Sequence, residues 1–239
     1  MDKNAFYKYV ESRGQSGYGA ALLVKEPGAM LYSLLIASTS VGFVSGGSDS
    51  FEFDLLNSPS KGKIMGKSSL EDKEVEFLLH RDNVYRLEQL KDKTLDFMYF
   101  TPDFMGWKFN GTIKYRPNDA GAGVLMGTYV ISPMSADETP ILDVSSLIQE
   151  TLCFSNSIPD TIEVGANSTV SQKFELVQSV TATFDVSKYN ATTGVWSDDN
   201  SVSFSSSTAT FSTAGLYAIK ASASGYAPWT TTVRVVPAT

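Results

Sequence analysis

The sequence predicts a mainly β fold in two parts: a β-sandwich or barrel with one helix, followed by a smaller antiparallel β-sandwich. Short segments rich in β-branched and aromatic residues recur along the whole chain, and only one segment has clear helical spacing. The composition also changes near residue 155, from a part that holds every Met to a part dominated by Ser, Thr, Val and Ala. Such a shift is typical of a domain boundary. We therefore expect one domain over residues 1–154 and a second over residues 158–239.

The second domain has the pattern of an all-β sandwich. Turn-forming Gly, Asn, Asp and Pro separate short segments with high strand propensity. Closely spaced short strands of this kind are typical of antiparallel sandwiches. The expected strands are Thr161–Val164, Ser171–Val177, Thr181–Val186, Val202–Ser205, Thr208–Phe211, Gly215–Ala223 and Thr230–Val236.

The first domain is predicted to be a sheet with one helix. In Ser50–Leu56 and Glu71–Leu79, apolar and acidic residues alternate, as they do in half-buried strands. Residues 57–69 contain Pro, Gly and Lys and are expected to form a flexible loop, and residues 1–29 an arm that orders on assembly. The remaining strands are expected at Met30–Val44 (as one or two), Thr94–Phe100, Trp107–Arg116 and Val124–Ile131.

The helix is predicted over Asp82–Lys93. Val84, Leu87 and Leu90 follow helical spacing, and Asp82 is a residue type that caps helix N-termini. Lys91 lies near the expected C-terminus, where a cation is favourable.

The charge and the apolar pattern exclude several classes of protein. The net charge of −7 and the pI of 4.8 argue against a general nucleic-acid binder and against a surface attracted to anionic lipid. The N-terminus has no apolar stretch typical of a signal peptide, and the most apolar segment, Met30–Val44, is too short and too polar to span a bilayer. We expect a protein that is soluble when made, with no membrane partner.

The residues also argue against an enzyme. His80 is the only histidine and Cys153 the only cysteine, so a zinc site or a second triad candidate cannot be assembled from them. We expect His80 to have a structural or surface role and Cys153 to be a buried thiol. A single cysteine also excludes an intramolecular disulfide. The prediction is no catalytic residues, no metal and no cofactor.

The C-terminal part resembles bacterial immunoglobulin-like domains over roughly residues 158–237. The residues that carry this resemblance are VWSDDNSVSF, which contains Trp196, and ATFSTAGLYAIKASASGYAPWTTTVRVV. The resemblance implies an immunoglobulin-like β-sandwich with Trp196 as its core tryptophan. The alternative is that Trp196, Tyr226 and Trp229 are exposed and stack on sugars.

The N-terminal part resembles the tail-tube proteins of long-tailed bacteriophages over roughly residues 30–150. The order of its segments carries the resemblance: SFEFDLL, NSPSKGKIMGKSS, LEDKEVEFLLH, DNVYRLEQLKDK, TLDFMYF, GWKFNGTIKYRPN and GVLMGTYVISP.

The resemblance implies a structural virion protein, made in the bacterial host cytoplasm. Its copies would form hexameric rings that stack into the tail tube, the conduit for DNA ejection. The implied partners are further copies and other tail proteins such as the tape measure and the terminator. DNA would pass without specific binding, and the immunoglobulin-like domain would decorate the tail and contact host surface glycans.

Two site hypotheses follow. If Ser50–Leu56 and Glu71–Leu79 pair as a hairpin, Glu52, Asp54, Glu74 and Glu76 gather on one face. In a tube lumen such a face repels phosphates, so that DNA slides. The alternative is an ordinary solvated face of an antiparallel sheet.

The second hypothesis concerns the loop at 57–69. The resemblance implies that this loop orders when rings stack, and its lysines would dock against an acidic patch of the next ring. The residues proposed for this role are Lys61, Gly62, Lys63, Ile64, Met65, Gly66 and Lys67. The alternative is a mobile surface loop without a partner.

A function from another class remains open. The chain would then be a cell-surface or glycan-binding module of the adhesin type, a stable monomer rather than a polymer.

Overall fold

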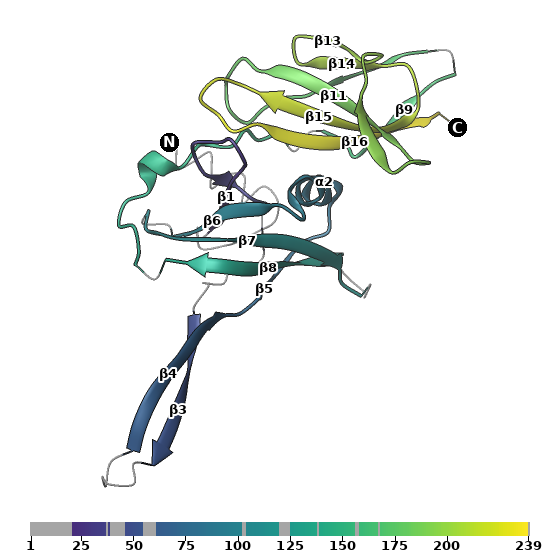
Figure 1. Ribbon diagram of the computed structural model, residues 1–239. Coiled ribbons are helices and arrows are strands. Elements are labelled where there is room, and N and C mark those ends of the chain that lie inside the picture. The colour runs from purple at the N-terminus through teal and green to yellow at the C-terminus, as the bar shows by residue number, and fades with distance from the viewer. Residues whose placement is uncertain are drawn as a thin grey trace. The chain divides into compact units, whose positions relative to one another are not determined.

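The computed structural model describes residues 21–36, 38, 46–54, 61–101, 104–119, 125–137, 139–155, 158–166 and 168–238, and for 46–54 and 61–69 it describes the backbone alone. The fold is mainly β, and the described residues contain one α-helix, α2 (Arg81–Leu90) (Figure 1). The chain divides into two compact units. Unit 1 includes His80–Arg86 and Ile148–Thr239, and unit 2 comprises Gly17–Leu79 and Leu87–Leu147.

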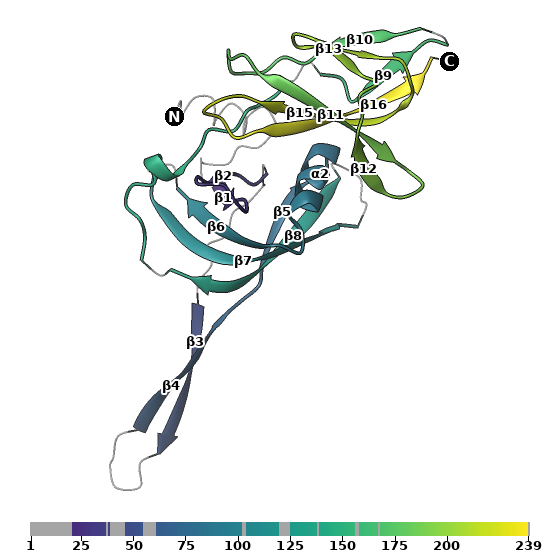
Figure 2. The ribbon, with the colours of Figure 1, turned by 45° about the horizontal axis from the view of Figure 1, so that its top comes forward.

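Unit 2 is built on a six-stranded antiparallel sheet in the order β2-β1-β6-β7-β8-β5. The three consecutive strands β6, β7 and β8 form its centre as a meander (Figure 2). The strands are β1 (Ala21–Lys25), β2 (Ser33–Leu34), β5 (Lys73–Leu78), β6 (Thr94–Phe100), β7 (Gly106–Pro117) and β8 (Met126–Ala136). A short 3-10 helix, η1 (Ser145–Leu147), follows β8.

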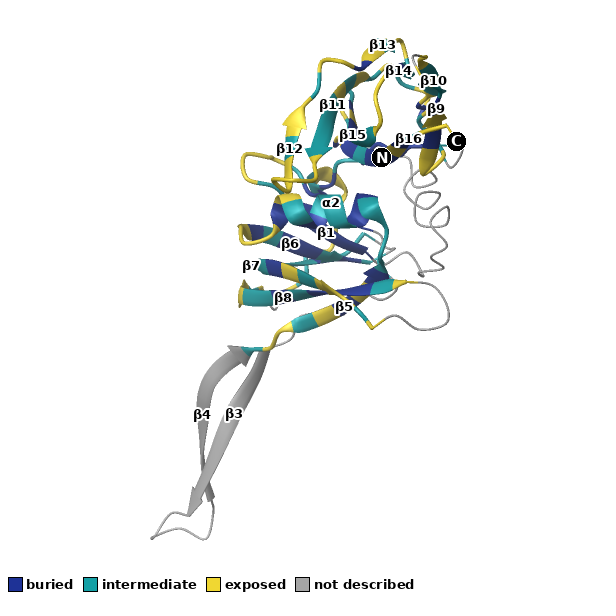
Figure 3. Ribbon diagram, turned by 90° about the vertical axis from the view of Figure 1, so that its right-hand side faces the viewer, coloured by how far each residue is buried: buried dark blue, intermediate teal, exposed yellow. Residues whose placement is uncertain are grey.

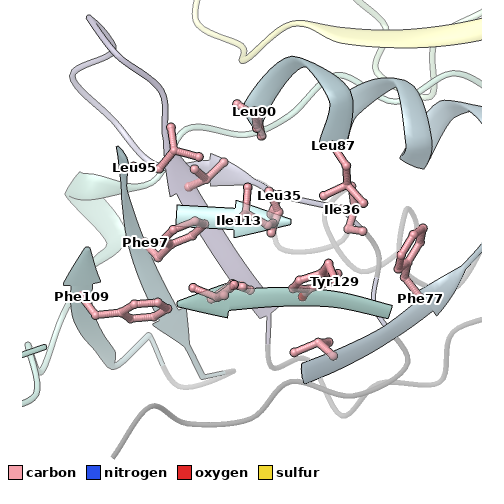
Figure 4. Packing of buried hydrophobic residues seen from close by; sticks show 14 residues of the cluster. Leu35, Ile36, Phe77, Leu87, Leu90, Leu95, Phe97, Phe109, Ile113 and Tyr129 are labelled. Atoms are coloured by element: carbon pink, nitrogen blue, oxygen red, sulfur yellow. The ribbon is translucent and has the colours of Figure 1, made fainter. Parts of the chain in front are cut away.

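The core of unit 2 lies on one face of this sheet. Alternation along the strands supplies Val75 and Phe77 from β5 and Tyr129 from β8, all 3% exposed or less. The C-terminal part of α2 adds Leu87 and Leu90 (Figure 4). The remaining members of this cluster are Leu22, Val24, Leu35, Ile36, Leu95, Phe97, Phe109, Ile113 and Ile131.

Within this core, Tyr129 is the largest buried polar side chain. Burial raises the pKa of its phenol, and the hydroxyl is hydrogen-bonded to Ser38 Oγ at 2.9 Å. Burial disfavours the charged phenolate, so the phenol stays protonated, and its buried hydroxyl needs a hydrogen-bond partner, which Ser38 provides.

Two expectations for the start of the chain were wrong. The arm expected over residues 1–29 contains β1, which lies between β2 and β6 and whose Leu23 and Val24 have no exposed surface. The strand expected over Met30–Val44 is reduced, among its described residues, to the two residues of β2. A short apolar run does not distinguish a strand from other buried backbone. Residues 1–20 lie outside the described residues.

The expected loop at 57–69 was also wrong for most of its length. β3 (Gly46–Asp54) and β4 (Lys61–Leu70) pair as an antiparallel two-stranded sheet, separate from the six-stranded one (Figure 1). We call β3 and β4 together the ribbon. Gly and Lys are depleted in strands, so the propensity of KGKIMGK opposes this assignment. Backbone pairing with β3 overrides it.

Unit 1 contains two sheets with immunoglobulin-like topology. The five-stranded sheet has the order β12-β11-β15-β16-β9, in which β9 is parallel to β16, and the three-stranded sheet has the order β10-β14-β13 (Figure 2). The strands are β9 (Thr161–Val164), β10 (Val170–Lys173), β11 (Thr183–Asn190), β12 (Val195–Asp198), β13 (Ser203–Ser205), β14 (Thr208–Phe211), β15 (Gly215–Ser222) and β16 (Trp229–Pro237).

Aromatic residues fill the core of this sandwich. Phe174, Phe211 and Tyr217 have no exposed surface, and Phe211 lies with its ring centroid 5.1 Å from that of Tyr217. The Tyr217 hydroxyl donates to the Thr213 carbonyl at 2.9 Å, the tyrosine corner typical of immunoglobulin-like domains. β16 is mostly buried, and Arg234 is an exposed residue between the buried Val233 and Val235 (Figure 3).

The expected core tryptophan was wrong. Trp196 lies on the edge strand β12, is partly exposed, and contacts Tyr189 with ring centroids 5.2 Å apart. Trp229, considered as an exposed sugar platform, is instead buried at 3% exposure, and Tyr226 is half-buried. Sequence pattern identifies a strand but not its position at the centre or edge of a sheet.

The division between the units lies earlier than the composition suggests. Unit 1 resumes at Ile148, not near residue 158. Leu152 donates its N–H to the Ala227 carbonyl at 2.9 Å, and Phe154 forms a β-bridge with Leu176. Leu152 and Phe154 are apolar, like much of the first half of the sequence, yet they are buried in unit 1.

Candidate assembly surface

The register of the ribbon gives it two different faces. Phe51 lies opposite Ile64 and Phe53 opposite Gly62, whereas the intervening pairs join Glu52 to Lys63 and Asp54 to Lys61. Because directly opposed residues of an antiparallel pair share a face, one face carries Phe51, Phe53 and Ile64. We call this set the apolar face of the ribbon, and the other its charged face.

The ribbon carries balanced charge. Its three lysines match three acidic residues, and the register places two of these lysines directly opposite carboxylates. Between Ser48 and Ser50 the register shifts, so that Gly66 and Lys67 together oppose Asp49, a β-bulge. Opposite charges across strands favour the pairing itself. The role of residues 61–67 in ring stacking stays a prediction.

The four acidic residues do not gather as expected. The expected hairpin of Ser50–Leu56 with Glu71–Leu79 was wrong, because β3 pairs with β4 and β5 pairs with β8. In β5 the predicted alternation is found, with Val75 and Phe77 buried between more exposed residues, but alternation does not specify the partner strand. The lumen role of Glu52, Asp54, Glu74 and Glu76 stays a prediction.

In β5 the two glutamates have partners on the sheet. Glu74 Oε1 accepts from Arg116 Nη2 at 3.2 Å, and Glu76 Oε1 accepts from Asn118 Nδ2 at 3.4 Å. Thr128 completes the group by donating to Asn118 Oδ1 at 2.6 Å. The face of the sheet away from the core is thus mixed in charge, with basic and amide groups beside each carboxylate.

The start of α2 differs from the sequence expectation. His80, not Asp82, is the N-cap: its carbonyl accepts from Val84 N at 3.0 Å, and its Nδ1 accepts from Asp82 N at 3.3 Å. His80 Nε2 lies 3.2 Å from Asp160 Oδ1, to which it can donate. His80 therefore has a structural place in unit 1.

The Asp82 carboxylate is an anchor within unit 1 that sequence analysis missed. It is 3% exposed. Its Oδ1 accepts from Thr232 N at 2.7 Å and Thr232 Oγ1 at 2.8 Å, and its Oδ2 accepts from Thr231 Oγ1 at 3.0 Å. These partners lie about 150 positions away in sequence, so no local pattern reveals them.

Cys153 is 2% exposed with a free thiol, as expected for a buried cysteine, and its Sγ lies 3.5 Å from the Thr151 carbonyl. The described part of the chain contains no cluster of three or more His, Cys, Asp or Glu that would hold a metal ion. No helix in it is long and apolar enough to cross a membrane.

Comparison with known proteins gives only distant similarity. No protein-family model matches the chain, and no curated protein matches it. Among solved structures, the titin Ig tandem domains A164-A165 align over 62% of this chain and 89% of theirs, with 11% identity and a TM-score of 0.29. A Dscam structure on isoform specificity aligns over 80% of this chain and 70% of its own, with 9% identity and a TM-score of 0.32. The description of unit 1 as immunoglobulin-like therefore depends on its own strand order and tyrosine corner.

Proposed function

We propose that this chain is a structural subunit of the tail tube of a long-tailed bacteriophage, located in the virion and without enzyme activity. Copies assemble into stacked rings of six, which form the conduit for DNA ejection. Tape measure and terminator proteins are the further partners. The immunoglobulin-like unit decorates the tail and contacts the host surface.

The ribbon is the observation that carries this proposal. A two-stranded sheet is marginally stable in water by itself, because it buries too little apolar surface to offset the entropy of ordering its backbone. β3 and β4 nevertheless have nine and ten residues, and the register gathers Phe51, Phe53 and Ile64 on one face. A ribbon of this kind is stabilised when a partner covers its apolar face.

A second copy of the chain is the partner that fits best. The ribbon is nearly neutral, so a surface of strong charge gains little from it. Apolar cover and main-chain pairing remain, and another copy offers both through its own ribbon and sheet. A contact between different surfaces of identical copies closes into a ring or extends as a filament. Rings that stack through such contacts make a tube.

Substitution on the apolar face tests the proposal. The double variant Phe51→Ser/Phe53→Ser should keep the six-stranded sheet, because the ribbon is a separate sheet, and should fail to assemble. The matched control is Glu52→Gln/Asp54→Asn, which alters the charged face of the same strand and should assemble. Sedimentation velocity over rising concentration gives the oligomer size, and circular dichroism checks that each variant is folded. Assembly of the apolar-face variant at the wild-type concentration would refute the role of the ribbon.

The full chain is the right material for these experiments. The buried Asp82 carboxylate has its partners in β16, so a truncation after residue 154 would remove them. Loss of assembly after such a truncation would not distinguish a lost contact from a damaged fold.

The lumen hypothesis has its own test. Charge reversal to Lys at Glu52, Asp54, Glu74 and Glu76 should slow DNA ejection if these residues line the tube, because a basic lining binds phosphates. Normal assembly with normal DNA delivery would count against it.

A further inference from the structure

A groove in unit 1 has the size and chemistry of a small-ligand site. Its volume is about 690 Å³, within the range of natural ligand pockets. β12 pairs only with the Ser187–Asn190 half of β11, and the groove follows the other half of that strand. The side chains that the argument uses are the aromatic Tyr85, Phe184 and Phe204 and the polar Ser187, Asp198 and Asn200.

Aromatic rings form its apolar part. Phe184 and Phe204 are stacked with ring centroids 5.0 Å apart and an interplanar angle of 1°, and both are half-buried. Tyr85 packs edge-on against Trp196, also at 5.0 Å, which fixes the orientation of its ring. Rigid, partly exposed rings give the groove an apolar wall, against which the C–H groups of a pyranose ring can pack.

The charged groups leave one carboxylate available. Asp185 lies opposite Lys220 in the strand register. The hydrogen bond from Ser201, and after it the charge of Lys188, lower the pKa of Asp199. Asp198 is exposed, and its Oδ1 accepts a single weak hydrogen bond, 3.4 Å long, from Ser187 Oγ. Asp198 and Tyr85 both line the groove, and the Asp198 charge adds to the effect of burial in raising the pKa of the Tyr85 phenol.

The charges and aromatic rings of the groove together favour a cationic ligand over an anionic one. Three carboxylates against Lys220 disfavour phosphates, sulfates and sugar acids. A carboxylate beside an aromatic ring favours an ammonium group, through a charge-assisted hydrogen bond and the negative face of the ring. Ser187 and Asn200 add neutral donors and acceptors that match sugar hydroxyls.

We propose that this groove binds an amino sugar with a free ammonium group, a glucosamine unit of a polysaccharide. The ammonium group pairs with Asp198, the pyranose ring packs on the aromatic wall, and the hydroxyls contact Ser187 and Asn200. This binding does not depend on assembly into a tube.

Calorimetric titration of the full chain with a β-1,4-linked glucosamine trimer tests the proposal, with the N-acetylglucosamine trimer as the neutral comparison. The glucosamine trimer should bind, more weakly at higher salt because the ion pair is screened. Asp198→Asn should weaken binding by roughly fivefold, the effect of one partly exposed charged contact. Asp143→Asn, at an exposed aspartate of unit 2, should leave binding unchanged.

Three results would overturn the proposal. They are equal binding of the two trimers, an Asp198→Asn variant that binds like the wild type, and no binding at millimolar sugar. The Phe51→Ser/Phe53→Ser variant separates this inference from the proposed function, because it should not assemble but should bind the glucosamine trimer normally.

Discussion

Replacement of the buried Asp82 carboxylate should destabilise unit 1 strongly. In Asp82→Ala the Thr232 N–H and the hydroxyls of Thr231 and Thr232 lose their acceptor inside the fold. A hydrogen bond to a charged group contributes about 1.5–3 kcal/mol, and an unsatisfied buried donor costs about 1–3 kcal/mol. The three bonds share one carboxylate and are not additive. We therefore expect a loss of about 3 kcal/mol, the lower end of what removing one member of a buried charged pair costs.

The isosteric variant Asp82→Asn separates the hydrogen bonds from the packing. Its amide oxygen still accepts from Thr232, while its NH₂ group faces the Thr231 hydroxyl, which can rotate to accept. The expected loss is about 1 kcal/mol. Asp119→Ala, at an exposed position, is the control and should stay within about 0.5 kcal/mol of the wild type.

Amide hydrogen exchange at Thr232 is the local assay, since this N–H donates directly to Asp82. A loss of about 3 kcal/mol corresponds to roughly a 150-fold larger open population, and exchange should accelerate by that factor when closing is fast. Exchange in Asp82→Ala within a few-fold of the wild type would refute the reasoning. Equal effects of the Ala and Asn variants would show that hydrogen-bond acceptance is not the cause.

Three further predictions concern single side chains. Gly111→Ala should lower the free energy of unfolding in urea by about 1–3 kcal/mol, because the new Cβ would lie 2.5 Å from the Ser132 carbonyl oxygen, a backbone atom that cannot move aside. A variant with wild-type stability would contradict this. Tyr217→Phe should cost about 1 kcal/mol by loss of the hydrogen bond to the Thr213 carbonyl, measured by thermal unfolding, and no change would mean that the corner does not stabilise the sandwich. Burial, and after it the nearby aspartates, raise the pKa of Tyr32 to about 12. The stability that Tyr32 contributes is therefore complete below pH 10 and falls as the pH rises toward 12. Tyr32→Phe should flatten this fall in the free energy of unfolding between pH 10 and 12, and an unchanged pH profile would contradict this.

Strands whose packing is local were predicted well from the sequence. β6, β9 and β14 have the predicted bounds. Each is a short run rich in β-branched or aromatic residues, and in β9 and β14 buried residues alternate with more exposed ones. The strand predicted at Trp107–Arg116 is also found within β7, where Phe109, Gly111 and Ile113 are buried.

Features determined by distant partners were not predictable in the same way. β4 lacks strand propensity and exists through its pairing with β3. The cap of α2 moves from Asp82 to His80 because the Asp82 carboxylate bonds to β16 instead. The edge position of Trp196 follows from strand order, which residue periodicity does not encode.

Electron microscopy of the full chain at rising concentration tests the central claim most directly. If the ribbon joins one copy to the next, negatively stained fields should show rings and, at higher concentration, stacked hollow tubes. Single particles of one-subunit size at every concentration would contradict the account.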